Sequence, residues 1–243
     1  MNMKILVCIS KTPDTTSKIA FSEGNTKFDE NGVQWIINPY DEWYSLVKAI
    51  ELKEKDPSIL IHLITVGGAD TEPIIRKALA LGGDEAIRVN NTSNDSMVVA
   101  QEIAAIAKEG AYDLILTGKE TIDYNSASIG SMLCALLDTT FIPNAIALEV
   151  NGTTAIVKRE IEGGEESCET SLPIILSCQK GMAEQRIPNM RGIMAARTKP
   201  LKVVEASLHN ATTSIKKFDT PPAKSGVKLV EAGNMDEMVR LLK

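Results

Sequence analysis

Short apolar runs and longer amphipathic stretches alternate along the first half of the chain. Runs typical of buried strands occupy residues 3–9, 59–66, 85–89 and 112–118. Stretches with apolar side chains at helical spacing occupy residues 38–55, 70–83, 96–110 and 128–138. Strands that alternate with helices of this length predict βαβ units, a parallel sheet and right-handed crossovers.

Start and stop residues support two of these helices. Pro39 lies near the first turn of the helix predicted over 38–55, where a missing backbone N–H leaves no hydrogen bond unmade. The helix predicted over 70–83 has Asp70 as its expected N-cap, Pro73 in its first turn and a glycine pair at its end.

After residue 144 the pattern changes to strand pairs. Two strand-like stretches within residues 145–161 flank Asn151-Gly152, a dipeptide typical of two-residue hairpins. Residues 165–173 and 173–178 carry further strand signals.

A second Asn-Gly dipeptide, Asn31-Gly32, predicts a smaller hairpin within residues 27–37, inserted between the first strand and the first helix. Residues 203–243 are weakly periodic and predict an extended arm that ends in a short helix from residue 235. Residues 1–202 therefore form the predicted α/β domain, and the sparse arm needs another surface to order it.

Composition narrows the function classes. The formal net charge of −6 argues against a nucleic-acid binder, which needs a basic face. The chain starts directly with a predicted strand, and no apolar run is long enough to span a membrane, so we expect a cytoplasmic protein without direct membrane insertion. The four cysteines are scattered and the two histidines lie far apart, so we expect structural cysteines and no metal site.

Three loops at the carboxyl ends of predicted parallel strands are candidates for a ligand site. They span residues 9–14, 66–70 and 117–130. Ser126 and Ser128 lie beside a predicted helix start, where free backbone N–H groups favour a phosphate, although the same serines could merely cap their own helix. Neither a Walker loop nor a GxGxxG dinucleotide fingerprint is present.

No set of residues predicts catalysis. Residues 158–166 place several glutamates around Gly163-Gly164, but no histidine or lysine base lies nearby, and a solvated turn or a charged docking edge is the simpler interpretation. The run from residue 180 to 202 is locally basic and rich in methionine. The sequence therefore predicts a binding or carrier protein and no enzyme.

The stretch at residues 157–200 reads "VKREIEGGEESCETSLPIILSCQKGMAEQRIPNMRGIMAARTKP", and "NPYDE", "ALALGG" and "GKETID" occur earlier in the chain. These stretches resemble the small (beta) subunit of electron transfer flavoproteins, and the first is the most specific. The three shorter ones are similar to the family's N-P-(F/Y)-x-E, A-L-A-M-G-A and G-K-Q-(A/S)-x-D stretches. The resemblance extends from about residue 3 to residue 202.

The resemblance implies a Rossmann-like fold of the adenine-nucleotide alpha-hydrolase type with added β-hairpins. It implies a heterodimer with an alpha subunit that holds most of the FAD. Such a heterodimer accepts electrons from acyl-CoA dehydrogenases or related flavoenzymes in fatty acid oxidation and passes them to a quinone oxidoreductase or another acceptor. It also implies AMP in the beta subunit, or a second FAD in bifurcating members. A stand-alone nucleotide-binding stress or signalling domain is the alternative from another class.

Carried onto this sequence, the family's nucleotide pocket and docking positions fall on two sets of residues. The nucleotide set is Cys8, Ser10, Asn38, Val66, Gly67, Gly118, Asp123, Ser126, Ser128, Ile129 and Gly130. The docking set is Met182, Glu184 and Arg186 in a recognition segment at about 180–200, with Glu160 and Arg159 at the partner interface.

Two departures from the family bear on these expectations. Ser128 replaces a glutamine of the nucleotide loop and Ile129 replaces a threonine or valine, which leaves AMP, FAD or an empty pocket open. Met182 occupies the position assigned to an anchoring leucine, and the resemblance implies that it docks on the dehydrogenase.

Overall fold

The computed structural model describes residues 3–224 and 226–242, and these form two compact units. The first unit comprises Met1–Lys18 and Glu30–Ser214, and the second comprises Ile19–Asp29 and Ile215–Lys243. Met1, Asn2, Ser225 and Lys243, which belong to the predicted domain and arm, lie outside the described residues.

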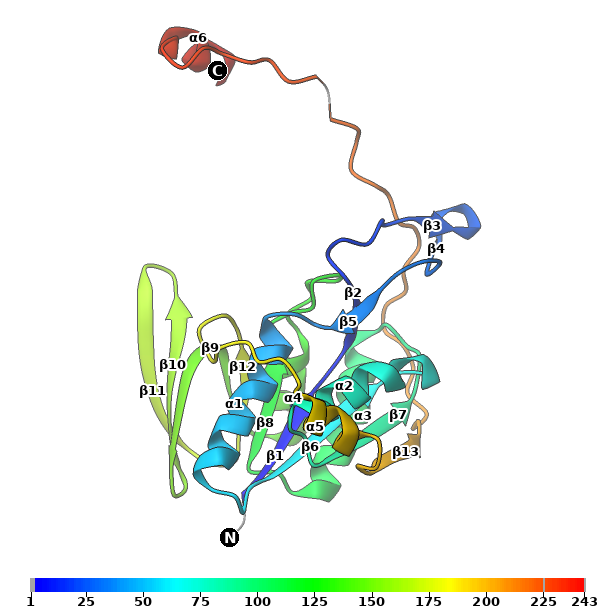
Figure 1. The fold of residues 1–243 in the computed structure, drawn as a ribbon, viewed down its shortest axis with the longest axis vertical. Helices are drawn as coiled ribbons and strands as arrows, with labels where there is room; N and C mark the ends of the chain where they lie inside the picture. The colour runs from blue at the N-terminus through cyan, green and yellow to red at the C-terminus, as the bar shows by residue number, and fades with distance from the viewer. Residues whose placement is uncertain (1–2, 225, 243) are drawn as a thin grey trace. The chain divides into compact units, whose positions relative to one another are not determined.

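The first unit is built on a nine-stranded sheet in the order β11-β10-β9-β12-β8-β1-β6-β7-β13 (Figure 1). The strands from β9 to β13 along this order are parallel, and β10 and β11 extend the sheet as antiparallel strands. The strand bounds are β1 Lys4–Cys8, β6 Leu60–Val66, β7 Glu85–Asn90, β8 Leu114–Gly118, β9 Thr140–Asn151, β10 Thr154–Ile161, β11 Gly164–Ser171, β12 Ile174–Cys178 and β13 Leu201–Glu205.

Helices cover both faces of the sheet, as the alternation of strand side chains requires. In β1, Ile5 and Val7 join the core cluster that contains residues of α1 and α2, whereas Leu6 joins the cluster beneath α3 and α4. The helix bounds are α1 Asp41–Lys55, α2 Glu72–Leu81, α3 Ser96–Gly110 and α4 Ile129–Leu137. The predicted α/β class with a mostly parallel sheet is confirmed.

The helix predicted over 70–83 begins differently from the prediction. Its N-cap is Thr71 and its first residue is Glu72, with the 3-10 turn η2 Ala69–Thr71 before it. Asp70 does not cap the helix, because its carboxylate pairs with Lys11.

The hairpin predicted at Asn151-Gly152 is confirmed. β9 and β10 pair as antiparallel strands from Thr154 opposite Asn151 onward, and Gly152 has a left-handed φ of 62° in the turn between them. β11 then pairs with β10 and forms the edge of the sheet.

The hairpin predicted within residues 27–37 does not form, although a turn is present at Asn31-Gly32. β5 Trp35–Ile37 pairs with β2 Lys11–Pro13 in the first unit, and β4 Lys27–Phe28 pairs with β3 Phe21–Ser22 in the second. A turn dipeptide specifies a local bend, but distant partners decide which strands pair.

The arm predicted from residue 203 does not begin there, because β13 Leu201–Glu205 pairs in parallel with β7. The first compact unit continues to Ser214, so the expected boundary at residue 202 falls inside a strand. β13 is a short edge strand with exposed Lys202 and Glu205, and such strands carry little hydrophobic periodicity.

The second unit contains a small aromatic cluster and the predicted terminal helix. The Phe21 and Phe218 rings stack with centroids 4.8 Å apart, and the Phe218 backbone N–H donates to the Asn25 carbonyl at 2.7 Å. The helix α6 spans Met235–Leu242, and its large apolar side chains are exposed.

A short helix after the core strands, α5 Met190–Ala196, packs closely on α2. Arg76 of α2 donates to the carbonyls of Ala196 at 2.9 Å and Lys199 at 2.6 Å. A Cβ at Gly192 of α5 would overlap the Ala80 carbonyl oxygen, so the close approach of the two helices requires glycine there.

Gly192→Ala is therefore expected to lower the free energy of unfolding by about 1–3 kcal/mol, because overpacking against backbone cannot be relieved by a rotamer change. Urea denaturation measures the effect. Gly164→Ala is the matched control, since a Cβ there meets nothing within 4 Å. Equal stability of the two variants would contradict the assigned helix contact.

Candidate functional site

The strand order places a ligand edge at the carboxyl ends of β1 and β8. From β1 the chain winds to one side through β6 and β7 and to the other through β8 and β12. In open α/β sheets, ligands bind beyond the carboxyl ends of strands at such a reversal. The segments that follow Cys8, Val66 and Gly118 therefore lie along one edge.

Glu42, in the first turn of α1, holds the segment that follows β1. Its carboxylate accepts hydrogen bonds from the Ser10 backbone N–H and from Ser10 Oγ, both at 2.6 Å. A Cβ on Gly118 would lie 2.9 Å from the Glu42 Cγ, so glycine lets β8 end directly against α1. Both donors of Ser10 are thus committed to the protein itself.

The electrostatics of this edge are set by the burial of Glu42, which is 6% exposed. Burial raises the pKa of Glu42 to about 8 against the two Ser10 hydrogen bonds, which lower it, and the charges of Asp123 and Asp41 raise it further. Glu42 therefore carries a proton at neutral pH, and the edge is less negative than its residue types suggest.

Asn38 fastens the long loop after β8 to the rest of the edge. Its side chain is fully buried, donates to the Glu120 carbonyl at 2.8 Å and accepts from the Ile122 N–H at 3.1 Å. The Asp41 carboxylate accepts from the Glu120 N–H at 3.1 Å. The loop is therefore fixed at residues 120–122, just before Asp123.

The rest of this loop reaches the N-terminus of α4 through an unusual backbone. Asn125 and Ala127 have left-handed φ values of 50° and 49°. Left-handed residues beside right-handed ones turn successive N–H groups toward a common point, which favours an anion. Ser126 is exposed and Ser128 is half-buried, and their hydroxyls lie 3.4 Å apart.

Gly130 serves packing at this helix start. A Cβ there would lie 2.5 Å from the Phe141 ring, so glycine allows α4 to lie against β9. Ile129 packs into the core beneath α3 and α4. Both residues therefore pack the first turn of α4 against the core.

The turn after β6 lies at the same edge. Gly67 donates its N–H to the Val89 carbonyl at 2.9 Å, and its carbonyl accepts from the buried Arg88 guanidinium at 3.0 Å. Arg88 also donates to Glu72 at 3.1 Å and to Asn90 at 3.0 Å. Arg88 therefore ties the turn to both β7 and α2.

The cysteine near this edge is chemically quiet. Cys8 is buried, and burial raises the pKa of its thiol far above the ordinary range, so it remains a neutral thiol. Among the described residues no group of His, Cys, Asp and Glu could hold a metal ion. In the described part of the chain no helix is long and apolar enough to cross a membrane.

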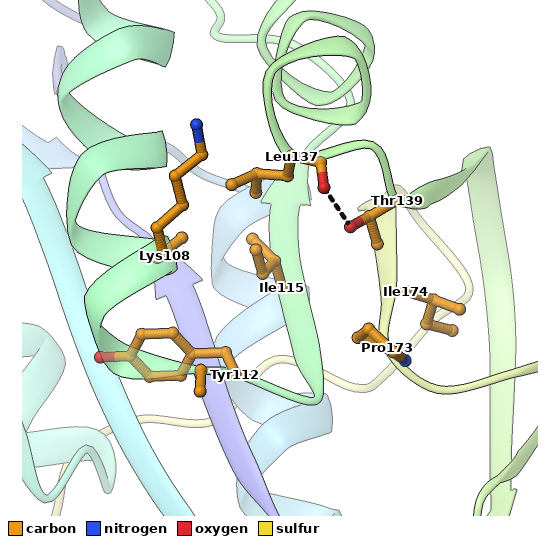
Figure 2. Close-up of a pocket in the computed structure, with 9 residues that line it drawn as sticks. Lys108, Tyr112, Ile115, Leu137, Thr139, Pro173 and Ile174 are labelled. Atoms are coloured by element: carbon orange, nitrogen blue, oxygen red, sulfur yellow. Dashed lines mark hydrogen bonds between the residues drawn. The ribbon is translucent and has the colours of Figure 1, made fainter.

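A small hollow lies at the opposite edge of the sheet, where β8 and β12 begin and α3 and α4 end (Figure 2). It has a volume of about 180 Å³, and its lining is mostly apolar, with Ile115, Leu137 and Pro173 among its residues. Thr139 Oγ1 donates to the Leu137 carbonyl at 3.1 Å beside it. Its position separates it from the residues expected to hold a nucleotide.

The structure places Met182 in the core, which contradicts its expected position at the tip of a docking loop. Met182 is 2% exposed and belongs to the cluster that includes residues of α1. Its N–H donates to the Gln179 carbonyl at 3.2 Å, a tight turn that folds the side chain back onto the sheet. The most exposed apolar side chains of this segment are instead Ile187 at 87%, Met190 at 73% and Met194 at 55%.

Three of the four charged residues of the docking set form hydrogen bonds or ion pairs within the chain. Arg186 pairs with Glu54 of α1 at 2.6 Å, and its carbonyl accepts from the Trp43 indole at 3.0 Å. Arg159 pairs with Glu166 across β10 and β11 at 2.5 Å, and Glu160 accepts from Gln179.

Glu184 is exposed and lies close enough to Tyr44 to raise the pKa of that phenol, although burial contributes more. Within the docking set, Arg186 thus tethers the segment to α1, whereas Glu184 remains on the surface.

Comparison with known proteins identifies the family of this chain. A family model described as "Electron transfer flavoprotein domain" matches residues 25–209. The electron transfer flavoprotein subunit beta of Bacillus subtilis (strain 168) is 36% identical over 255 aligned residues, covering 99% of this chain and 98% of that protein. The chain belongs to the electron transfer flavoprotein family.

Two further relatives extend the comparison. The electron transfer flavoprotein subunit beta of Syntrophomonas wolfei is 36% identical over 231 residues, covering 94% of this chain and 90% of that protein. Subunit CarD of the caffeyl-CoA reductase-Etf complex of Acetobacterium woodii is 28% identical over 250 residues, covering 97% of this chain and 95% of that protein. The beta-subunit resemblance seen in the motifs is therefore confirmed.

Sequence reasoning did not single out the two buried ionisable residues that shape this edge of the electron transfer flavoprotein fold. Glu42 lies in the "NPYDE" stretch beside residues of the apolar face of α1, and Arg88 interrupts the apolar strand "EAIRV". A charged residue within an apolar pattern was the available signal, because such a group must find partners inside the protein.

The raised pKa of Glu42 predicts a pH-dependent stability. Between its ordinary value near 4.5 and about 8, the folded protein holds a proton that the unfolded chain releases, so stability falls as pH rises through this window. Each pKa unit corresponds to about 1.4 kcal/mol. Glu42→Gln cannot ionise, so the stability advantage of the variant over the wild type is expected to grow from pH 5 to pH 8.

Urea denaturation at several pH values measures this difference. Glu109→Gln, at an exposed position near the end of α3, is the control for removing one carboxylate. A constant difference between Glu42→Gln and the wild type across this pH range would contradict the assignment of a proton to Glu42.

Proposed function

We propose that this chain is the nucleotide-binding beta subunit of a heterodimeric electron transfer flavoprotein. Its role is that of an electron carrier subunit, as the names of its relatives indicate. In this proposal an alpha subunit holds most of the FAD, and the heterodimer moves electrons from an acyl-CoA dehydrogenase or a similar flavoenzyme to a quinone oxidoreductase or another acceptor. The near-complete alignment with beta subunits is the observation that carries the proposal.

The nucleotide in this subunit is proposed to be AMP, held at the edge formed by β1, β6 and β8. The left-handed residues Asn125 and Ala127 and the start of α4 offer backbone N–H groups to a phosphate. The hydroxyls of the exposed Ser126 and the half-buried Ser128 are further donors beside them. The proton on Glu42 reduces the repulsion that an anion would otherwise meet.

The surface for the electron donor is proposed to lie on α5 and the segment before it. Ile187, Met190 and Met194 offer flexible or branched apolar side chains that fit an apolar pocket. The contacts of α5 with Arg76 and Ala80 hold this surface on α2, so docking there needs little ordering of the backbone.

We propose that the alpha subunit binds the arm. The arm is amphipathic and has no hydrophobic core of its own, so it needs a partner surface to cover its apolar side chains. Val227, Leu229 and Leu242 of the second unit expose their apolar side chains almost fully. Exposed apolar positions of this density favour an interface over a free surface.

The nucleotide proposal predicts that Ser128→Asp weakens AMP binding by about tenfold or more, because a carboxylate beside the phosphate repels it. Isothermal titration of AMP into the nucleotide-free heterodimer measures the affinity. Ser167→Asp, on the exposed edge strand β11, adds the same charge elsewhere and is the control.

Analysis of the native heterodimer decides which nucleotide the subunit holds. Acid release followed by chromatography is expected to yield one AMP and one FAD per heterodimer. If two flavins per heterodimer are found, this subunit holds a second FAD and not AMP. If Ser128→Asp leaves the AMP affinity unchanged, the nucleotide does not bind beside Ser128.

The docking proposal predicts that Met190→Glu slows electron transfer from an acyl-CoA dehydrogenase by about tenfold or more, since a charge cannot enter an apolar pocket without losing its hydration. Stopped-flow reduction of the heterodimer FAD measures the rate, and FAD content is expected to stay unchanged. Lys108→Glu, on the surface at the end of α3, is the control.

Met182→Ala is the comparison within the same segment. It is expected to lower the free energy of unfolding by about 2–5 kcal/mol, because it leaves a cavity in the core. A wild-type transfer rate in Met190→Glu would contradict the assignment of this surface.

A further inference from the structure

The segment from residue 206 to residue 214, which we call the strap, follows β13 and has no regular secondary structure. Two buried acidic groups face it, Asp95 at the start of α3 and Glu102 within that helix. Asp95 is 4% exposed although its residue type prefers water. A buried carboxylate needs hydrogen-bond donors, and most of those of Asp95 come from the strap.

The two oxygens of Asp95 serve two different parts of the chain. Oδ1 accepts from the Met97 N–H at 2.9 Å and the Val98 N–H at 3.0 Å, which caps the N-terminus of α3. Oδ2 accepts four hydrogen bonds from the strap: the N–H and Oγ1 of Thr212, both at 2.9 Å, and those of Thr213 at 2.6 and 2.7 Å. One carboxylate thus joins residues that are 117 and 118 positions apart.

Glu102 provides a second attachment nearer to β13. Its Oε2 accepts from the Ser207 N–H at 3.2 Å, and its Oε1 accepts from Asn91 Nδ2 at 3.0 Å. Ala206 packs against the core beneath α3. The strap is therefore held at its start by Glu102 and near its end by Asp95, with a span between them that exposes Leu208 completely.

We propose that Asp95 is a positioning residue for subunit assembly: it caps α3 and at the same time holds the strap, and so fixes the point at which the partner-binding arm begins. The chain passes from the strap into the arm at Ile215. This inference rests on the proposed contact of the arm with the alpha subunit. A strap free of Asp95 would add mobile residues to the tether, which lowers the effective concentration of the arm at its binding surface.

The negative charge of Asp95 strengthens its hold on the strap. The Thr213 hydroxyl, the Val98 N–H and the other donors hold the pKa of Asp95 well below its usual range, so the group stays ionised at any physiological pH. Hydrogen bonds to an ionised acceptor are stronger than neutral ones. A neutral amide at this position could keep the cap but could not accept all four strap donors.

Asp95→Asn separates the two roles of this residue. Asparagine caps helices as well as aspartate does, so α3 is expected to keep its stability. Its amide nitrogen would face the donors of Thr212 and Thr213, and the strap should be released. Glu109→Gln removes one exposed carboxylate from the same helix and is the matched control.

Three measurements on the heterodimer follow the strap and the assembly separately. Hydrogen exchange at the Thr212 and Thr213 amides, with tryptic cleavage after Lys216 and Lys217, reports on the strap. Both are expected to accelerate about tenfold or more in Asp95→Asn, while α3 amides keep their protection. Sedimentation is expected to show about tenfold weaker association with the alpha subunit, and the double variant Thr212→Val, Thr213→Val is expected to lie between it and the wild type.

A chain that ends at Ser214 separates failure of this inference from failure of the proposed arm contact. If that truncation weakens association but Asp95→Asn does not, Asp95 has no positioning role and the arm contact stands. If truncation leaves association unchanged, the arm contact falls and the positioning role falls with it. Unchanged exchange at Thr212 and Thr213 in Asp95→Asn would show that Asp95 does not hold the strap.

Discussion

Burial of β1 on both faces is the constraint on which the rest of the structure depends. Ile5 and Val7 enter one core and Leu6 and Cys8 enter the other, while β6 and β8 satisfy the backbone on either side. A strand enclosed in this way can present chemistry only beyond its carboxyl end. The residues that follow it must therefore be fixed by neighbours, and the first turn of α1 supplies Glu42 for that purpose.

The parallel part of the fold was predictable from the sequence because its strands and helices have strong hydrophobic periodicity. Strands buried on both faces read as continuous apolar runs, and the helices between them carry an apolar stripe and recognisable ends. The edge strand β13 was missed because an exposed edge mixes Lys202 and Glu205 with its valines. The pairing of β2 with β5 was missed because it depends on partners outside the turn at Asn31-Gly32.

The sequence predicts which loops form the candidate site, but it does not predict which of their side chains face a ligand. The nucleotide positions implied by the family resemblance fall along one edge, since the topology brings those strand ends together. Whether a side chain at such an edge faces a ligand or the protein depends on its neighbours. Ser10 gives both donors to Glu42, and Met182 turns inward at a bend that its residue type does not reveal.

Glu42 and Asp95 show how the same functional group acquires opposite properties in one fold. Glu42 is buried with the two donors of a single serine and two acidic neighbours, so its proton is retained. Asp95 is buried with donors from a helix start and from the strap, so its charge is retained. The number of donors decides between the two states, because burial penalises the charge in both cases. The same fold therefore contains a neutral glutamic acid at the end of β1 and a charged aspartate that holds the strap.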